Sequence, residues 1–187
     1  MKELEELKHL MKLKEVLRRD EVGDRRASTA EHTWGCMILA DHFIKRVDQP
    51  LDELKVMKLL LYHDLVEVEV GDTFLLDVEG QKTKAEREKN GSRILAKKIP
   101  GSISDDFIRF FEEYEDGETP EAKFALAMDK LEPIVQWSLH GTEKLTSLGW
   151  TEQVIRDLKE KHMEPFPELL KFFNDWLEHM KEEGYVK

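Results

Sequence analysis

Apolar residues recur every three or four positions along almost the whole chain, which is the spacing of one buried helix face. The first such segment ends near the basic pair Arg18-Arg19, and its apolar stripe consists of Leu4, Leu7, Leu10, Met11 and Leu17. A polar stretch at residues 20–27 follows and is predicted to be a linker.

A second helix is predicted from Ser28 toward Val47. Ser28 and Glu31 have the spacing of a capping box, in which a serine hydroxyl and a glutamate three residues later satisfy each other's backbone N–H groups. His32 therefore lies in the first turn of this helix.

Residues from about 51 to about 70 predict a third helix, which carries the sequence LLYHDLVEVEVGD at positions 60–72. The alternating valines and glutamates at 66–70 would also suit a short strand. Because the sequence offers no partner strand, we prefer the helix and expect Gly71 to stop it.

The rest of the chain also has helical spacing. One helix is especially well marked, because Thr119 suits its N-cap, Pro120 its first position and Gly141 the position after its end. The predicted ranges are about 82–98, 104–114, 119–140, 151–161 and 167–183. The sequence thus predicts an all-α globule of seven or eight helices, forming a single compact domain over residues 1–187.

Charge and composition indicate which classes of ligand the protein can bind and which compartment it occupies. The formal net charge is −11, so the surface as a whole should repel nucleic acid polymers and anionic membranes, although one pocket can still bind a small anion. Cys36 is the only cysteine, which excludes an intrachain disulfide and favours a reducing compartment. The sequence has no signal peptide and no apolar run of about 20 residues, so we expect a cytoplasmic protein.

Three polar side chains share one sector of the third predicted helix. His63 and Asp64 are adjacent and Glu67 follows within one turn, while residues 59–62 before them are apolar. Neighbouring helical side chains point about 100° apart, so these polar groups can reach one ligand. Taken alone, the doublet also fits a solvated helix end.

Asp129 is unusual because it lies in the middle of an apolar helical segment. Aspartate is a poor helix-interior residue and is rarely buried without a partner. Pro133 lies four residues later, which removes the helical partner of the Asp129 carbonyl and predicts a kink. A metal ligand fits this position, and an exposed aspartate paired with Lys130 or Lys123 fits it equally well.

His32 could likewise be a capping or packing residue if considered alone. Together, however, His32, His63, Asp64 and Asp129 form a set of two imidazoles and two carboxylates from three helices. Such nitrogen and oxygen donors suit one divalent ion, namely Mn, Co, Fe, Ni, Zn or Mg, and leave room for water or substrate.

The motifs STAEH, HDLVE, GD and EAKFALAMDKLEP occur in this order. This arrangement resembles the HD superfamily of metal-dependent phosphohydrolases, whose signature falls on His32, His63, Asp64 and Asp129. Within the superfamily the chain is similar to the small single-domain group that includes the 5′-deoxynucleotidases. The resemblance extends from the first helix to about residue 140, and the last third of the chain matches more loosely.

The resemblance implies roles for three further residues. Glu67 and Asp72 match acidic residues that act at the reacting phosphate, and Arg18 matches an arginine that contacts the phosphate. Arg19 stands where that group carries an aromatic residue against the sugar, so the resemblance does not extend to sugar selectivity. Arg25 and Arg26 are second candidates for phosphate binding, although an exposed basic pair in a linker is the simpler interpretation.

We therefore expect a metal-dependent phosphomonoesterase that acts on (deoxy)nucleoside 5′-monophosphates or a similar small phosphate ester. The resemblance also implies a homodimer. Other chemistries of the superfamily are the enzymatic alternatives: phosphodiester cleavage, alarmone hydrolysis and nucleoside triphosphate hydrolysis. The non-enzymatic alternative is a helical module that only binds a metal.

Overall fold

The computed structural model of the chain describes residues 1–139 and 150–186. Within these ranges eight helices have ten residues or more, which confirms the all-α prediction. They are α1 (Lys2–Met11), α2 (Thr29–Phe43), α3 (Glu53–Tyr62), α5 (Val78–Leu95), α6 (Gly101–Asp116), α7 (Pro120–Leu139), α9 (Glu152–Met163) and α10 (Pro167–Glu182). A short helix α4 (Glu67–Val70), a 3-10 turn at Lys12–Glu15 and a β-hairpin complete the described elements.

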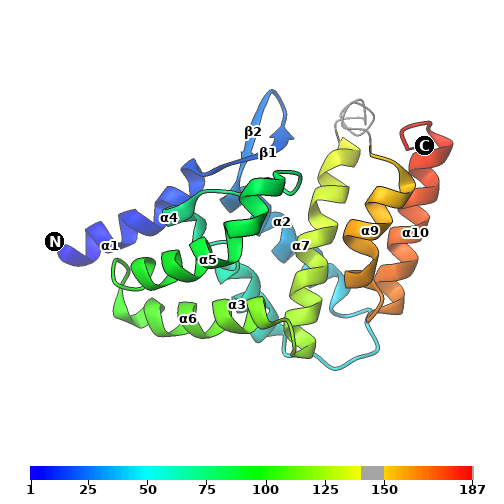
Figure 1. Cartoon of the computed structure of the whole chain (residues 1–187). Helices are drawn as coiled ribbons and strands as arrows, with labels where there is room; N and C mark the ends of the chain where they lie inside the picture. Colours follow the sequence, from blue (N-terminus) through cyan, green and yellow to red (C-terminus); the bar gives the residue numbers. More distant parts are fainter. Residues whose placement is uncertain (140–149, 187) are drawn as a thin grey trace.

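Helix α7 occupies the middle of the fold (Figure 1). It contacts α2, α3 and α6, and also α9 and strand β1 (Leu17–Val22), so it joins the C-terminal helix pair to the rest. Its buried side chains come from more than one face, and alanines at positions 122, 125 and 127 let neighbouring helices approach closely. A helix that is apolar on most sides has to be surrounded by others.

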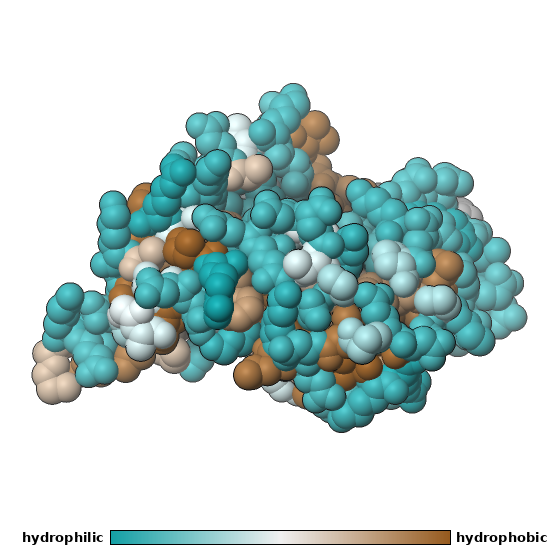
Figure 2. Space-filling view, turned by 90° about the horizontal axis from the view of Figure 1, so that it is seen from below, coloured by the Kyte–Doolittle hydropathy of each residue, from teal (hydrophilic) through white to brown (hydrophobic). Residues whose placement is uncertain are grey.

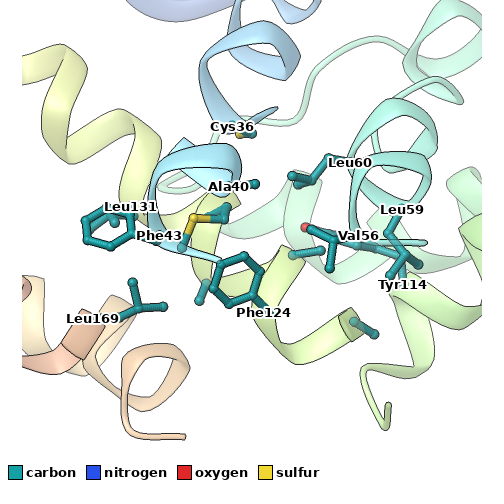
Figure 3. Close-up of a cluster of buried hydrophobic side chains, with 14 of the residues drawn as sticks. Cys36, Ala40, Phe43, Val56, Leu59, Leu60, Tyr114, Phe124, Leu131 and Leu169 are labelled. Carbon is teal, nitrogen blue, oxygen red and sulfur yellow. The ribbon is translucent and has the colours of Figure 1, made fainter. Parts of the chain in front are cut away.

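The hydrophobic core forms where α2, α3 and α7 meet, with Leu169 of α10 at its edge (Figure 3). Phe124, Leu59 and Leu60 are among the largest side chains that are fully buried. Each such burial contributes about 1.5–3 kcal/mol to folding. The face seen in Figure 2 is mostly hydrophilic, with separate hydrophobic patches between hydrophilic residues.

The predicted linker at residues 20–27 is wrong, because this stretch belongs to an antiparallel hairpin. Strand β1 pairs with β2 (Arg25–Ser28), and Val22 lies opposite Arg25 across a turn at Gly23-Asp24. Gly23 has a φ of +62°, which glycine adopts without a steric penalty. The first helix accordingly ends at Met11, well before Arg18.

The single third helix predicted over about 51–70 is also wrong, although its helical character is right. Helix α3 ends at Tyr62, a turn covers residues 63–66, and α4 begins at Glu67. Within the turn the N–H of Leu65 donates to Tyr62 and that of Glu67 donates to Asp64. These bonds span three residues instead of four, so the chain is wound more tightly at His63-Asp64.

The start of α7 agrees with its predicted capping, since the N–H of Ala122 donates to Oγ1 of Thr119 at 3.2 Å. The predicted stop at Gly141 lies outside the described residues. Pro100 was expected only to stop the helix before it. It is also the N-cap of α6. Among the described helices, none combines the length and the hydropathy that a membrane span requires.

Candidate metal centre and adjoining cavity

Four buried side chains with donor atoms lie within 4.8 Å of one another: His32, Cys36, His63 and Asp129. Three of them belong to the predicted ligand set. Cys36 was missed, although its position one helical turn after His32 placed it on the same face of α2. Its Sγ lies 3.5 Å from Nε2 and 3.8 Å from Nδ1 of His32, so the sulfur packs against the imidazole.

Asp64, the fourth predicted ligand, stands beside this cluster. Its Oδ2 is 3.2 Å from Nε2 of His63 and 3.8 Å from Nε2 of His32. Burial opposes ionisation of Asp64, but His63 and Arg18 hold its pKa well below the usual value. All four predicted ligands therefore meet at one place, because the turn after α3 brings residues 63 and 64 against α2 and α7.

Both imidazoles are held by their Nδ1 atoms. Nδ1 of His32 lies 2.6 Å from Oε2 of Glu132, and Nδ1 of His63 lies 2.7 Å from the carbonyl oxygen of Leu60. Since Nδ1 of each ring already has a partner, Nε2 is the atom that each imidazole turns toward the cluster. Nε2 of His32 lies 3.1 Å from Oδ1 of Asp129. Sequence reasoning missed Glu132, although it lies one turn after Asp129.

Nε2 of His63 is buried and has no hydrogen-bond partner among the described residues. A buried polar nitrogen without a hydrogen-bond partner is costly, and a metal ion would satisfy it. Two imidazole nitrogens beside the carboxylates of Asp64 and Asp129 fit a divalent ion by donor type. The arrangement is thus able to hold a metal.

Asp129 remains ionised although it is buried. Tyr114 donates its hydroxyl to Oδ2 at 2.9 Å, and Nζ of Lys130 lies 2.6 Å from the same oxygen. Burial would raise the pKa of Asp129, but Lys130 and His32 hold it well below the usual value. The pairing with Lys130 that the alternative predicted is therefore present, but the aspartate is buried and not exposed.

Glu67 and Asp72 lie on the cavity side of the cluster. Glu67 is 2% exposed and accepts a hydrogen bond from Oγ1 of Thr29 at 2.7 Å. Burial and the negative charge of Asp64 raise its pKa well above the usual value. Burial also raises the pKa of Asp72, although Arg18 opposes this effect.

Arg18 reaches the same cavity from strand β1. Its Nη1 lies 3.3 Å from Oδ2 of Asp64 and 3.7 Å from Oδ1 of Asp72, so it bridges two carboxylates. The second candidates do not reach the cavity. Arg25 pairs with Glu31 at 2.5 Å, and Arg26 donates to the carbonyl of Leu17 at 2.8 Å within the hairpin.

A cavity of about 150 Å³ opens beside these residues. Its wall combines carboxylates, cations and aromatic rings, so it suits a polar ligand that carries negative charge. The cations are Arg18, Arg19, Lys84, Lys130 and Lys159; the aromatic residues are Phe74, Trp137 and Trp150.

Comparison with known proteins identifies the family. A model of the HD domain matches residues 10–170, so the chain belongs to the HD domain family. The 5′-deoxynucleotidase HDDC2 of Homo sapiens is 30% identical over 114 residues, which is 61% of this chain and 54% of that protein. HDDC2 of Bos taurus is 29% identical over 111 residues, or 59% and 53% of the two chains. The chain spans about half the length of these curated relatives.

Solved structures agree over nearly the full length. A protein from Magnetospirillum magnetotacticum MS-1, described as a predicted metal-dependent phosphohydrolase, superimposes with a TM-score of 0.87 and 26% identity. The match covers 99% of this chain and 94% of that one. A conserved hypothetical protein from Pyrococcus furiosus has a TM-score of 0.64 at 21% identity, which shows the fold alone.

Proposed function

We propose that the protein is a metal-dependent phosphomonoesterase whose ligands are His32, His63, Asp64 and Asp129. The observation that carries this proposal is the buried Nε2 of His63, which has no hydrogen-bond partner among the described residues. It faces carboxylates beside a cavity that also contains an arginine. Membership of the HD domain family supports the same assignment. A bound divalent ion would polarise a phosphate oxygen and lower the pKa of a bound water.

Glu67 acts as the general base in this proposal. Burial raises its pKa, which makes the ionised carboxylate a stronger base toward a water proton than an ordinary glutamate. Asp72 holds or protonates the leaving oxygen, and its own raised pKa suits an acid. Arg18 neutralises the phosphate charge and is already aligned by Asp64 and Asp72.

The proposed substrates are (deoxy)nucleoside 5′-monophosphates or similar small phosphate esters. This choice is supported by the names of the relatives, which are 5′-deoxynucleotidases. The net charge of −11 supports a small ligand over a nucleic acid polymer. A homodimer in solution stays a prediction, for which sedimentation velocity is the direct measurement.

Phosphate release from a panel of nucleoside monophosphates tests the activity. With added Mn or Co we expect release by the wild type and a loss of at least about 100-fold for Asp64→Ala, because one ligand and the partner of Arg18 disappear. Glu178→Gln, which changes an exposed carboxylate of α10, is the matched control. No release by the wild type, or equal release by Asp64→Ala, would contradict the proposal.

The alternatives are separated in the same panel. Faster turnover of a cyclic dinucleotide, an alarmone or a deoxynucleoside triphosphate would assign one of the other HD chemistries. A metal that raises the melting temperature without any turnover would instead indicate a non-catalytic binding module.

A further inference from the structure

Lys159 of α9 is a buried cation at the edge of the proposed active site. Its residue is 2% exposed, yet it lines the cavity that contains Asp64 and Asp129. Nζ donates to the backbone carbonyl of Lys130 at 2.9 Å and lies 5.0 Å from the centre of the Trp137 ring. Among the described residues, no carboxylate lies within ion-pair distance of this ammonium group.

Three other cations of the cavity have a carboxylate partner. Arg18 pairs with Asp64 at 3.3 Å, and Lys84 pairs with Glu88 at 3.5 Å. The side chain of Lys130 pairs with Asp129. A buried ammonium group that has only a carbonyl acceptor is costly to maintain, because two of its three hydrogens lack a strong partner. An anion brought by a ligand would supply that partner.

A second unused donor lines the same cavity. Nε1 of Trp150 is buried and has no acceptor among the described residues. The Trp150 ring lies 4.7 Å from that of Trp137, whose face Lys159 covers. The two donors therefore belong to one wall, formed by the end of α7, the start of the C-terminal helices and the side chain of Lys159.

Two aromatic rings of the cavity each have one face covered by a cation. The face of Trp137 is covered by Lys159, and that of Phe74 is covered by the guanidinium of Arg19 at 5.0 Å. The wall is also close to the proposed metal site, since Lys159 contacts the residue that follows Asp129. A compact ligand can therefore contact both ends of the 150 Å³ cavity.

We propose that the Lys159 ammonium and the Trp150 indole N–H form a second acceptor-binding subsite beside the phosphate site. The subsite takes an anionic group, so the preferred substrates are compact phosphomonoesters that carry a second phosphate or a carboxylate. This inference rests on the proposed phosphomonoesterase function and narrows its substrate class.

Matched substrate pairs test the subsite. In one pair, 3-phosphoglycerate and glycerol 3-phosphate differ by the carboxylate; in the other, a nucleoside 3′,5′-bisphosphate and its 5′-monophosphate differ by a phosphate. We expect the wild type to prefer the more acidic member by about tenfold in kcat/KM, the effect of one charge-assisted hydrogen bond. The pair with the larger preference distinguishes carboxylate from phosphate.

Lys159→Met should abolish that preference by raising KM for the acidic member much more than for the other member. Lys159→Arg should retain it, because the charge remains. Trp150→Phe removes the N–H and keeps a ring, so it should reduce the preference with less effect on folding. This variant also tests the subsite if Lys159→Met does not fold.

Two results would overturn the subsite: no preference in the wild type, or an equal loss for both members of each pair in Lys159→Met. The second result would assign Lys159 the structural task of capping the Lys130 carbonyl. If the wild type hydrolyses nothing, the proposed function fails, and calorimetric binding of 3-phosphoglycerate against glycerol 3-phosphate still tests the subsite. Equal binding of these two compounds would then contradict it.

Discussion

Glu132 shows how one side chain outside the predicted ligand set prepares a ligand within it. Its carboxylate fixes the imidazole of His32 through Nδ1 at 2.6 Å. The approach depends on Gly35, because a Cβ at that position would lie 2.7 Å from Oε1 of Glu132. The negative charge also makes the imidazole a stronger donor toward a metal.

Glu132→Gln should weaken metal binding while leaving the fold intact, since the amide oxygen still accepts a hydrogen bond but carries no charge. We expect a loss of about tenfold or more in affinity for Mn or Zn. Competition against a fluorescent chelator measures it, with Glu178→Gln as the exposed control. Equal affinities of the two variants would show that Glu132 only packs against His32.

Glu88 of α5 provides a test of pH dependence. The residue is 3% exposed, and burial raises the pKa of its carboxyl to about 7, against the opposing effect of Lys84. Since this folded-state pKa exceeds the ordinary 4.5, the proton-linked stability is fully present below pH 4.5 and is lost as the pH rises through 7.

Glu88→Gln removes this titration. Its free energy of unfolding relative to the wild type should therefore rise between pH 5 and pH 8, by an amount on the order of 1–3 kcal/mol. Urea unfolding at both pH values, with a chelator present throughout, gives the difference. A pH-independent difference would mean that Glu88 titrates normally in the folded protein.

At the scale of elements, the packing of α5 against α4 positions Glu67. Gly91 of α5 makes this close approach, because a Cβ there would lie 2.7 Å from Cγ1 of Val70 and 3.0 Å from Cγ2 of Val66. Val66 and Val70 flank Glu67 in the chain. A larger residue at position 91 would therefore push α4 away from α5.

Gly91→Ala should lower the free energy of unfolding by about 1–3 kcal/mol through overpacking, although alanine has the higher helix propensity. Gly101→Ala is the matched control, since a Cβ there meets nothing within 4 Å. Urea denaturation compares the two. Equal stability would show that the valine side chains can move aside at little cost.

Most of the helices, but not the hairpin, were predicted correctly from the sequence. The helical spacing located α2, α5, α6, α7, α9 and α10 to within a few residues, because each buries one apolar face or more. The hairpin was missed because its strands consist mainly of charged residues, although Gly23-Asp24 is a recognisable hairpin turn. The end of helix α3 before residue 63 was missed because no proline or glycine lies there to indicate it.

The site was easier to anticipate than its supports. His32, His63, Asp64 and Asp129 carry a motif, so sequence spacing was enough to gather them. The contacts of Glu132 and Lys159 depend instead on how α2 and α9 cross α7, which no local pattern encodes. The roles proposed for Glu132 and Lys159 could therefore be inferred only from the three-dimensional structure.

At the scale of the whole molecule, a ligand that joins α2, the turn after α3 and α7 should stabilise the fold. Metal at 100 times its dissociation constant adds about 2.7 kcal/mol to the free energy of unfolding. Thermal melts with Mn or Zn against a chelator measure the shift. Asp129→Ala should reduce it strongly, and an unchanged shift in that variant would place the metal elsewhere.

Helix α7 contacts α2, α3, α6, α9 and strand β1, and it also carries Asp129, Lys130 and Glu132. Few of its positions can therefore change without affecting either the packing of the molecule or its charged centre. Substrate preference can diversify most freely where side chains enter the cavity from other segments, such as Arg19 and Lys159. We therefore expect substitutions at such positions to cost less folding stability than substitutions in α7.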